Sequence, residues 1–171
     1  TFEIIVRHMI DKISGDIMIK DLKTIDKFNY YDIISNNMQL YSYLSSSDSN
    51  NIKSLSGIKY LTNLTEIKIT ENKLMNIGEI NNLKKLTKLD LSFNRITDIN
   101  TLTGLDKLKY LNLNGNNLKT INELTTFDNL KKLSLYHTNI TDITPIINHK
   151  KLTYLNLESN RISDISGLKE L

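Results

Sequence analysis

The fold is decided by the stretch that reads Leu86-Thr87-Lys88-Leu89-Asp90-Leu91-Ser92-Phe93-Asn94-Arg95-Ile96-Thr97-Asp98-Ile99-Asn100-Thr101-Leu102. Its spacing of leucine, asparagine and isoleucine recurs every 22 positions along the chain of 171 residues. The first leucine of successive copies falls at Leu64, Leu86, Leu108, Leu130 and Leu152. Self-similarity at a fixed period of this length marks a solenoid, in which each copy buries its apolar side against the next one.

Each copy divides into a strand, a corner and a return segment. Leu89 and Leu91 alternate with polar neighbours, which predicts a half-buried strand whose leucines face inward. In the return segment, the pair Thr97-Asp98 favours a short turn, because such side chains bond nearby backbone groups. The period and pattern are those of the leucine-rich repeat. We therefore predict an α/β leucine-rich repeat solenoid with a curved parallel β-sheet, a 3-10 or irregular convex side and an α-helical N-terminal cap.

Two columns of the repeat carry polar residues at inward or corner positions. The corner column holds Asn72, Asn94, Asn116 and Asn160, with Thr138 in the fourth copy. An amide side chain both donates and accepts, so it can pair the backbone groups that leave the sheet at the corner. Thr138 has one donor, which predicts a locally weaker rung. His149 occupies a column that is otherwise leucine or phenylalanine, and we expect its ring to lie partly wet at the convex rim.

The bulk composition narrows the function classes. A net charge of +3 is too small to imply nucleic acid, and no apolar run is long enough to span a membrane. Cysteine is absent, which excludes disulfides but assigns no compartment, so a cytoplasmic location stays open. The chain has no phosphate-binding loop, metal-binding histidine pair or nucleophile motif. We therefore predict a protein that is not an enzyme and uses neither a metal nor a cofactor.

The N-terminal region departs from the period, and we divide the chain accordingly. Residues 1–57 are predicted to form a helical cap with an insertion and a degenerate first repeat, and residues 58–171 to form five repeats, the last one truncated. Apolar residues between Phe2 and Ile13 lie on one face of an amphipathic helix that Gly15 would end. Asp21 is predicted to cap a second helical turn that holds Leu22, Ile25 and Phe28. The degenerate rung is expected near Leu44–Ser47, with Ile52, Leu55 and Ile58 in its return segment.

Several phrases resemble one subclass of these repeat proteins. They run over residues 52–64, 140–146 and 162–168, and the stretch from Ser14 to Leu22 is similar to the cap that precedes such repeats. Together they resemble the internalin family of secreted or surface-attached bacterial proteins. The resemblance implies a secreted or cell-surface module that binds a protein partner, with a host receptor among the candidates.

The segment from Asn29 to Ser49 has no counterpart of this length in the family pattern. It contains Tyr30, Tyr31, Tyr41 and Tyr43, which are four of the eight tyrosines in the chain. One interpretation is an enlarged cap whose aromatic rings cover the end of the solenoid. The other is a recognition loop.

Outward positions of the predicted strands and corners collect aromatic residues from the second copy onward. The candidate partner-binding residues are Phe93, Tyr110, Lys132, Tyr136, His137 and Tyr154. Aromatic groups on a rigid sheet supply large contact area at low entropic cost, as binding hot spots require. Tyrosines on neighbouring strands can also simply brace one another. The N-terminal half of the same face is more charged, which would tune orientation and association rate.

Two alternatives to an exported recognition module stay open. The chain could be an intracellular scaffold that resembles the 22-residue-repeat regulatory subunit of protein phosphatase 1, or a structural stalk without a preferred partner. At the C-terminal end, Leu155, Leu157, Ile162 and Ile165 would be exposed. We expect further repeats, a cap or another domain to cover them, or a dimer formed through this end.

Overall fold

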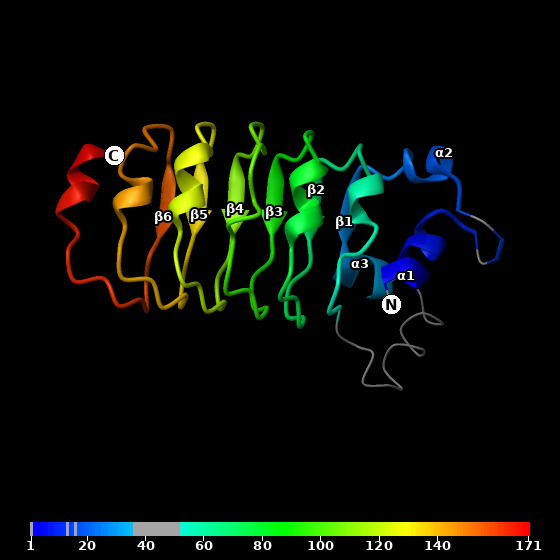
Figure 1. The fold of residues 1–171 in the computed structure, drawn as a ribbon, viewed down its shortest axis with the longest axis horizontal. Helices are drawn as coiled ribbons and strands as arrows, with labels where there is room; N and C mark the ends of the chain where they lie inside the picture. The colour runs from blue at the N-terminus through cyan, green and yellow to red at the C-terminus, as the bar shows by residue number, and fades with distance from the viewer. Residues whose placement is uncertain (1, 13, 16, 36–51) are drawn as a thin grey trace.

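In the described part of the chain, six short parallel strands run side by side. The structure is a computed structural model, and it describes residues 2–12, 14–15, 17–35 and 52–171 (Figure 1). The strands are β1 (Lys27–Asn29), β2 (Glu66–Lys68), β3 (Lys88–Asp90), β4 (Tyr110–Asn112), β5 (Lys132–Ser134) and β6 (Tyr154–Asn156). Each strand pairs with the next one in the chain, in the order β1 to β6. This confirms the predicted solenoid with a parallel sheet.

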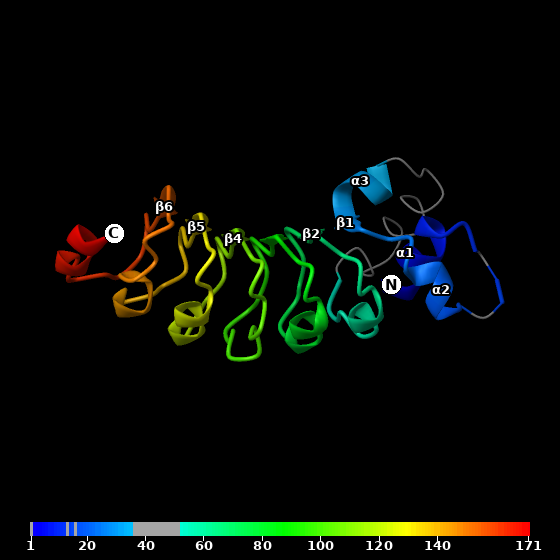
Figure 2. The same ribbon diagram turned by 90° about the horizontal axis from the view of Figure 1, so that it is seen from above.

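The return segments form the opposite, convex layer, as Figure 2 shows. They contain five 3-10 turns, η1 (Ile58–Tyr60), η2 (Gly78–Asn82), η3 (Asn122–Thr126), η4 (Thr144–Ile146) and η5 (Ser166–Glu170). Asp98, Asp142 and Asp164 each accept a hydrogen bond from the backbone N–H two residues later, at 2.7–2.8 Å. Hydrogen bonds from Thr144 lower the pKa of Asp142, and those from Ser166 do the same for Asp164. These carboxylates therefore shape the turns, as predicted.

The asparagine column joins neighbouring rungs through buried amides. Asn116 accepts from the Ile96 N–H at 2.9 Å and donates to the carbonyl oxygens of Leu91 and Leu113 at 3.0 and 2.9 Å. Each amide thus replaces the sheet partners that the backbone loses at the corner.

Thr138 occupies the corner position without an amide side chain, and the backbone groups at this corner are paired in another way. Its hydroxyl donates to the Leu135 carbonyl at 2.9 Å, and its backbone oxygen accepts from the Leu118 N–H at 3.1 Å. In the asparagine rungs, a side-chain amide oxygen takes that N–H instead. The following residue, Asn139, adopts a left-handed conformation with φ of 62°. In this rung, a backbone carbonyl oxygen therefore replaces the side-chain amide oxygen as the acceptor.

His149 is more deeply buried than predicted. Only 8 % of the residue is exposed, whereas we expected a partly wet ring. Its Nε2 lies 2.8 Å from the Leu124 carbonyl oxygen and its Nδ1 lies 3.2 Å from that of Ile146. The ring bridges two successive convex turns, and these polar contacts explain why the core column tolerates it.

In its described residues, the N-terminal cap contains two helices, α1 (Phe2–Met9) and α2 (Ile19–Leu22). Ile5 and Val6 are buried in the common core, and Met9 and Ile10 pack against it. Asp21 accepts from the Met18 N–H at 2.9 Å and pairs with Lys12 at 3.1 Å. These contacts lower the pKa of Asp21, the hydrogen bond from Met18 first.

The first rung lies elsewhere than predicted. Phe28 does not continue a helical turn but is the buried centre of β1, and it pairs in register with Ile67 of β2. The predicted rung near Leu44–Ser47 falls outside the described residues, whereas its predicted return residues Ile52, Leu55 and Ile58 are buried. The insertion therefore lies inside the first repeat, between β1 and the return segment that begins at Ile52.

Helix α3 (Tyr30–Ser35) follows β1 directly and stands on the concave side of the sheet (Figure 2). Tyr30 is buried, and its ring meets that of Tyr31 edge-on at 5.6 Å between centroids. The Tyr31 hydroxyl donates to Oε2 of Glu71 at 3.1 Å, which ties α3 to the corner after β2. Burial first, and then Glu71, raises the pKa of Tyr31. Tyr41 and Tyr43 lie outside the described residues.

Candidate functional site

Three of the six predicted binding residues form one row across the sheet. Tyr110, Lys132 and Tyr154 are register partners on β4, β5 and β6. Lys132 is exposed, Tyr154 is 48 % exposed, and Tyr110 is partly buried. Burial chiefly, and the nearby carboxylate of Asp90, raise the pKa of Tyr110. We call these three residues the aromatic row.

The other three predicted residues lie at the corners where strands end. Phe93 follows β3, and Tyr136 and His137 follow β5. The rings of Tyr136 and His137 lie 6.0 Å apart between centroids. The predicted set is thus divided between the row and the corners.

The corner positions share an unusual backbone. Five equivalent residues have φ between 51° and 64°, namely Glu71, Phe93, Gly115, His137 and Ser159. Four of them carry a side chain in a conformation that L-residues rarely adopt. Only Gly115 is glycine, and a Cβ there would lie 2.4 Å from Cδ1 of Phe93. The Phe93 ring therefore lies against the space that Gly115 leaves, with 49 % of the residue exposed.

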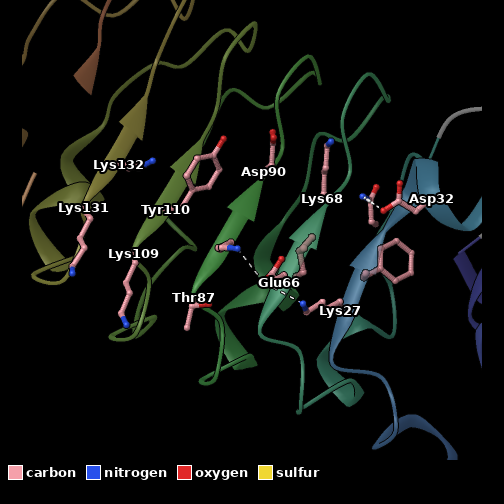
Figure 3. A pocket seen from close by; sticks show the side chains of 14 residues that line it. Lys27, Asp32, Glu66, Lys68, Thr87, Asp90, Lys109, Tyr110, Lys131 and Lys132 are labelled. Carbon is pink, nitrogen blue, oxygen red and sulfur yellow. Dashed lines mark hydrogen bonds and ion pairs between the residues drawn. The ribbon is translucent and has the colours of Figure 1, made fainter. Parts of the chain in front are cut away.

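A hollow of about 780 Å³ extends over the concave face from β1 to β5, seen closely in Figure 3. Strands β1 to β5 and helix α3 contribute to its lining. The charged residues around it are Lys27, Asp32, Glu66, Lys68, Lys88, Asp90, Lys109, Lys131 and Lys132. Of the predicted binding residues it reaches only Tyr110 and Lys132.

Ion pairs join the strands at the floor of this hollow. Oε1 of Glu66 lies 3.1 Å from Nζ of Lys88 and 3.6 Å from Nζ of Lys27. The hydrogen bond from Lys88 is the main cause that lowers the pKa of Glu66. Because all three are cross-strand neighbours, their charges alternate across β1, β2 and β3.

Sequence reasoning missed part of this hollow. It did not assign Lys27 or Asp32 to the face, since β1 and α3 were not predicted. It also passed over Lys109 and Lys131, although each stands just before a strand with its side chain outside the leucine pattern. Across the described ranges, no group of histidine, aspartate and glutamate side chains is arranged to hold a metal ion. Nor does any helix in those ranges have the length and apolar character needed to cross a membrane.

Comparison with known proteins identifies the repeat. Residues 84–126 and 128–170 each match the family described as Leucine Rich repeats (2 copies). The chain belongs to the leucine-rich repeat family. No protein of curated function has a significantly similar sequence. Domains of this fold are typically protein-binding and usually non-catalytic.

Solved structures extend the resemblance over nearly the whole chain. Internalin InlF of Listeria monocytogenes is 27 % identical, with a TM-score of 0.81 over 97 % of this chain and 45 % of its own. Internalin C2 of the same organism is 25 % identical, with a TM-score of 0.81 over 98 % of this chain and 67 % of its own. A leucine-rich repeat protein of Leptospira interrogans is 30 % identical, with a TM-score of 0.66 over 71 % of this chain and 32 % of its own. The chain therefore spans less than half of the length of InlF.

Proposed function

We propose that this internalin-like domain binds a protein partner through the concave face, with the aromatic row as the centre of contact. The observation that carries the proposal is the alignment of Tyr110, Lys132 and Tyr154 on three consecutive strands. Their backbones are fixed by the sheet, so binding does not have to order the backbone at these positions. Tyrosine is among the residue types enriched in the hot spots that dominate binding energy in protein interfaces.

The corner residues extend the proposed surface. Phe93 and His137 are exposed on left-handed backbone, which holds them in fixed directions at the edge of the face. Tyr136 lies beside His137. We assign these three residues a supporting role at the rim of the interface, where contacts contribute less than central ones do.

The setting of the proposal rests on resemblance. Likeness to two Listeria internalins supports an exported or surface-attached bacterial protein, and a host protein is a natural class of partner for it. An intracellular scaffold would use the same concave face. The exported module would find its partner on host cells, and the scaffold would find it inside the source organism. The experiment therefore tests binding to both.

The test measures binding of the labelled domain to intact animal cells and to proteins captured from the source organism. A triple variant, Tyr110→Ala/Lys132→Ala/Tyr154→Ala, removes the aromatic row. A matched control, Lys59→Ala/Tyr60→Ala/Met75→Ala, removes residues of similar size and exposure outside the concave face. Circular dichroism verifies that both variants fold.

Saturable binding to cells that the row variant loses and the control keeps supports the exported recognition module. The same pattern with bacterial proteins alone favours the intracellular scaffold. Binding that survives loss of the row contradicts the assigned contact surface. Absence of binding from both sources contradicts a recognition function and favours the structural stalk.

A further inference from the structure

Three lysines form a cluster beside the aromatic row. The backbone N–H groups of Lys131 and Lys132 both donate to the Lys109 carbonyl oxygen, at 2.8 and 3.0 Å, so the three residues are immediate neighbours. All three are exposed and line the hollow; Figure 3 shows Lys132 beside Tyr110, and Lys109 and Lys131 close to each other lower in the view. We call them the β4–β5 lysine cluster.

The charges of this cluster are unbalanced within the described part of the chain. In the described residues, none of these three lysines forms an ion pair. The acidic residues that line the hollow, in contrast, already form ion pairs or accept hydrogen bonds from neighbouring residues. Glu66 pairs with lysines of both neighbouring strands, and Asp90 accepts from the Ser92 N–H and hydroxyl at 3.1 and 2.7 Å. Asp32 accepts from the side-chain amide of Asn29. Since like charges on neighbouring strands repel, an external anion would stabilise the cluster.

We propose that the β4–β5 lysine cluster binds an acidic segment of the partner protein. This inference rests on the proposed function and names the chemistry of the partner at that site. Carboxylates of the segment pair with Lys109, Lys131 and Lys132, and an apolar or aromatic residue beside them packs on Tyr110. The partner therefore carries acidic residues next to an apolar contact.

The sign pattern of the hollow favours a protein segment over a nucleic acid. Asp32, Glu66 and Asp90 lie in the same hollow as the lysines. A nucleic acid has negative charge at every nucleotide, so a strand that crosses the hollow would meet these carboxylates. A protein segment can place its acidic residues only over the cluster and neutral or basic residues toward Asp90.

Fluorescence anisotropy with three labelled probes tests the proposal. The probes are a short glutamate-rich peptide with one tyrosine, the same peptide with glutamine at every glutamate, and single-stranded RNA of equal total charge. The variant is Lys109→Gln/Lys131→Gln, which leaves the aromatic row intact. Its control, Lys53→Gln/Lys119→Gln, removes the same charge from exposed positions in the return segments.

The glutamate peptide should bind the folded domain at low ionic strength, more tightly than the RNA and the glutamine peptide. The cluster variant should weaken that binding about fivefold or more, since two screened ion pairs are lost, and the control should leave it unchanged. Equal weakening by both variants, tighter binding of the RNA, or no binding of the acidic peptide would overturn the proposal.

The same variants separate this inference from the proposed function. If the cluster variant binds the cellular or bacterial partner as the unmodified domain does, while loss of the aromatic row abolishes that binding, the lysine assignment fails and the recognition surface stands. If loss of the row changes nothing, the proposed function fails whatever the peptide does.

Discussion

The first rung and the later rungs build the same sheet from different sequence. Strands β2 to β6 recur with the 22-residue period and carry isoleucine or leucine at their centres. The first rung uses Phe28 at that position and then departs into α3 on the concave side. The later rungs therefore supply a regular surface with the aromatic row, and the first rung supplies a wall at one end of it. The difference shows that the non-repeating part of this solenoid shapes its concave face.

The largest effect should come from a core truncation in each kind of rung. Phe28→Ala should lower the free energy of unfolding by about 3–5 kcal/mol and Leu111→Ala by about 2–5 kcal/mol, because both side chains are almost fully buried. Urea unfolding followed by circular dichroism measures both. Tyr110→Ala, on the outward face, should cost much less. A cost of less than about 1 kcal/mol for Phe28→Ala would mean that the first rung is not part of the common core.

Gly115 and Phe93 should be coupled in a double-mutant cycle. Gly115→Ala should destabilise the domain by about 2–3 kcal/mol, since the new Cβ meets the Phe93 ring and φ is 64°. In the Phe93→Ala background the clash is gone, and only the backbone strain of about 1 kcal/mol remains. Thermal and urea unfolding of the four proteins give the coupling energy. Additive effects would show that the ring does not occupy the space beside Gly115.

The elements that repeat every 22 residues were predicted correctly from the sequence. The strands β2 to β6, the convex turns and the asparagine corners follow from residues such as Leu89, Asn94 and Asp98, because local pattern and tertiary position agree there. Phe28 was misassigned, since the insertion hides its spacing from Ile67 and a three-residue strand has little signal of its own.

The candidate site was predicted only in part for the same reason. Outward positions on regular strands gave Tyr110, Lys132 and Tyr154, which the register aligns. The positions of Asp32 and of helix α3 at the end of the concave face do not follow from the 22-residue period, because both belong to a segment that lies outside the repeat pattern. The left-handed corners at Phe93 and His137 were also missed, because phenylalanine rarely adopts positive φ and a single histidine does not mark that conformation in a sequence.

The corner amides offer a smaller test within the regular rungs. Asn116→Thr should cost about 1–2 kcal/mol, since it removes a buried amide that makes hydrogen bonds to the preceding rung and within its own rung. Thr138→Asn should stabilise the domain by up to about 1 kcal/mol if Asn139 leaves its left-handed conformation. Hydrogen exchange at Leu118, whose N–H bonds to the Thr138 backbone, reports the local change. Destabilisation by Thr138→Asn would mean that the shifted backbone is already the better solution for this rung.

The smallest effect should come from the ion pairs that join the first rung to the regular ones. Glu66 lies between Lys27 and Lys88, and its lowered pKa means that the folded state favours the carboxylate. The resulting stabilisation is present above the ordinary pKa of 4.5 and is lost as the pH falls through the lower folded value. Because the side chain is one-third exposed, Glu66→Gln should cost less than about 1 kcal/mol at neutral pH.

Urea unfolding of the unmodified domain and of Glu66→Gln across the acidic range measures this contribution. The two proteins should converge as Glu66 becomes protonated, and Lys88→Met should reproduce most of the neutral-pH loss because Lys88 is the nearer partner. A difference that stays constant into acid would assign the effect to packing. Since Glu66 reaches Lys27 of β1 and Lys88 of β3 through its carboxylate, convergence would show that this side chain joins the first rung to the regular ones only while it is ionised.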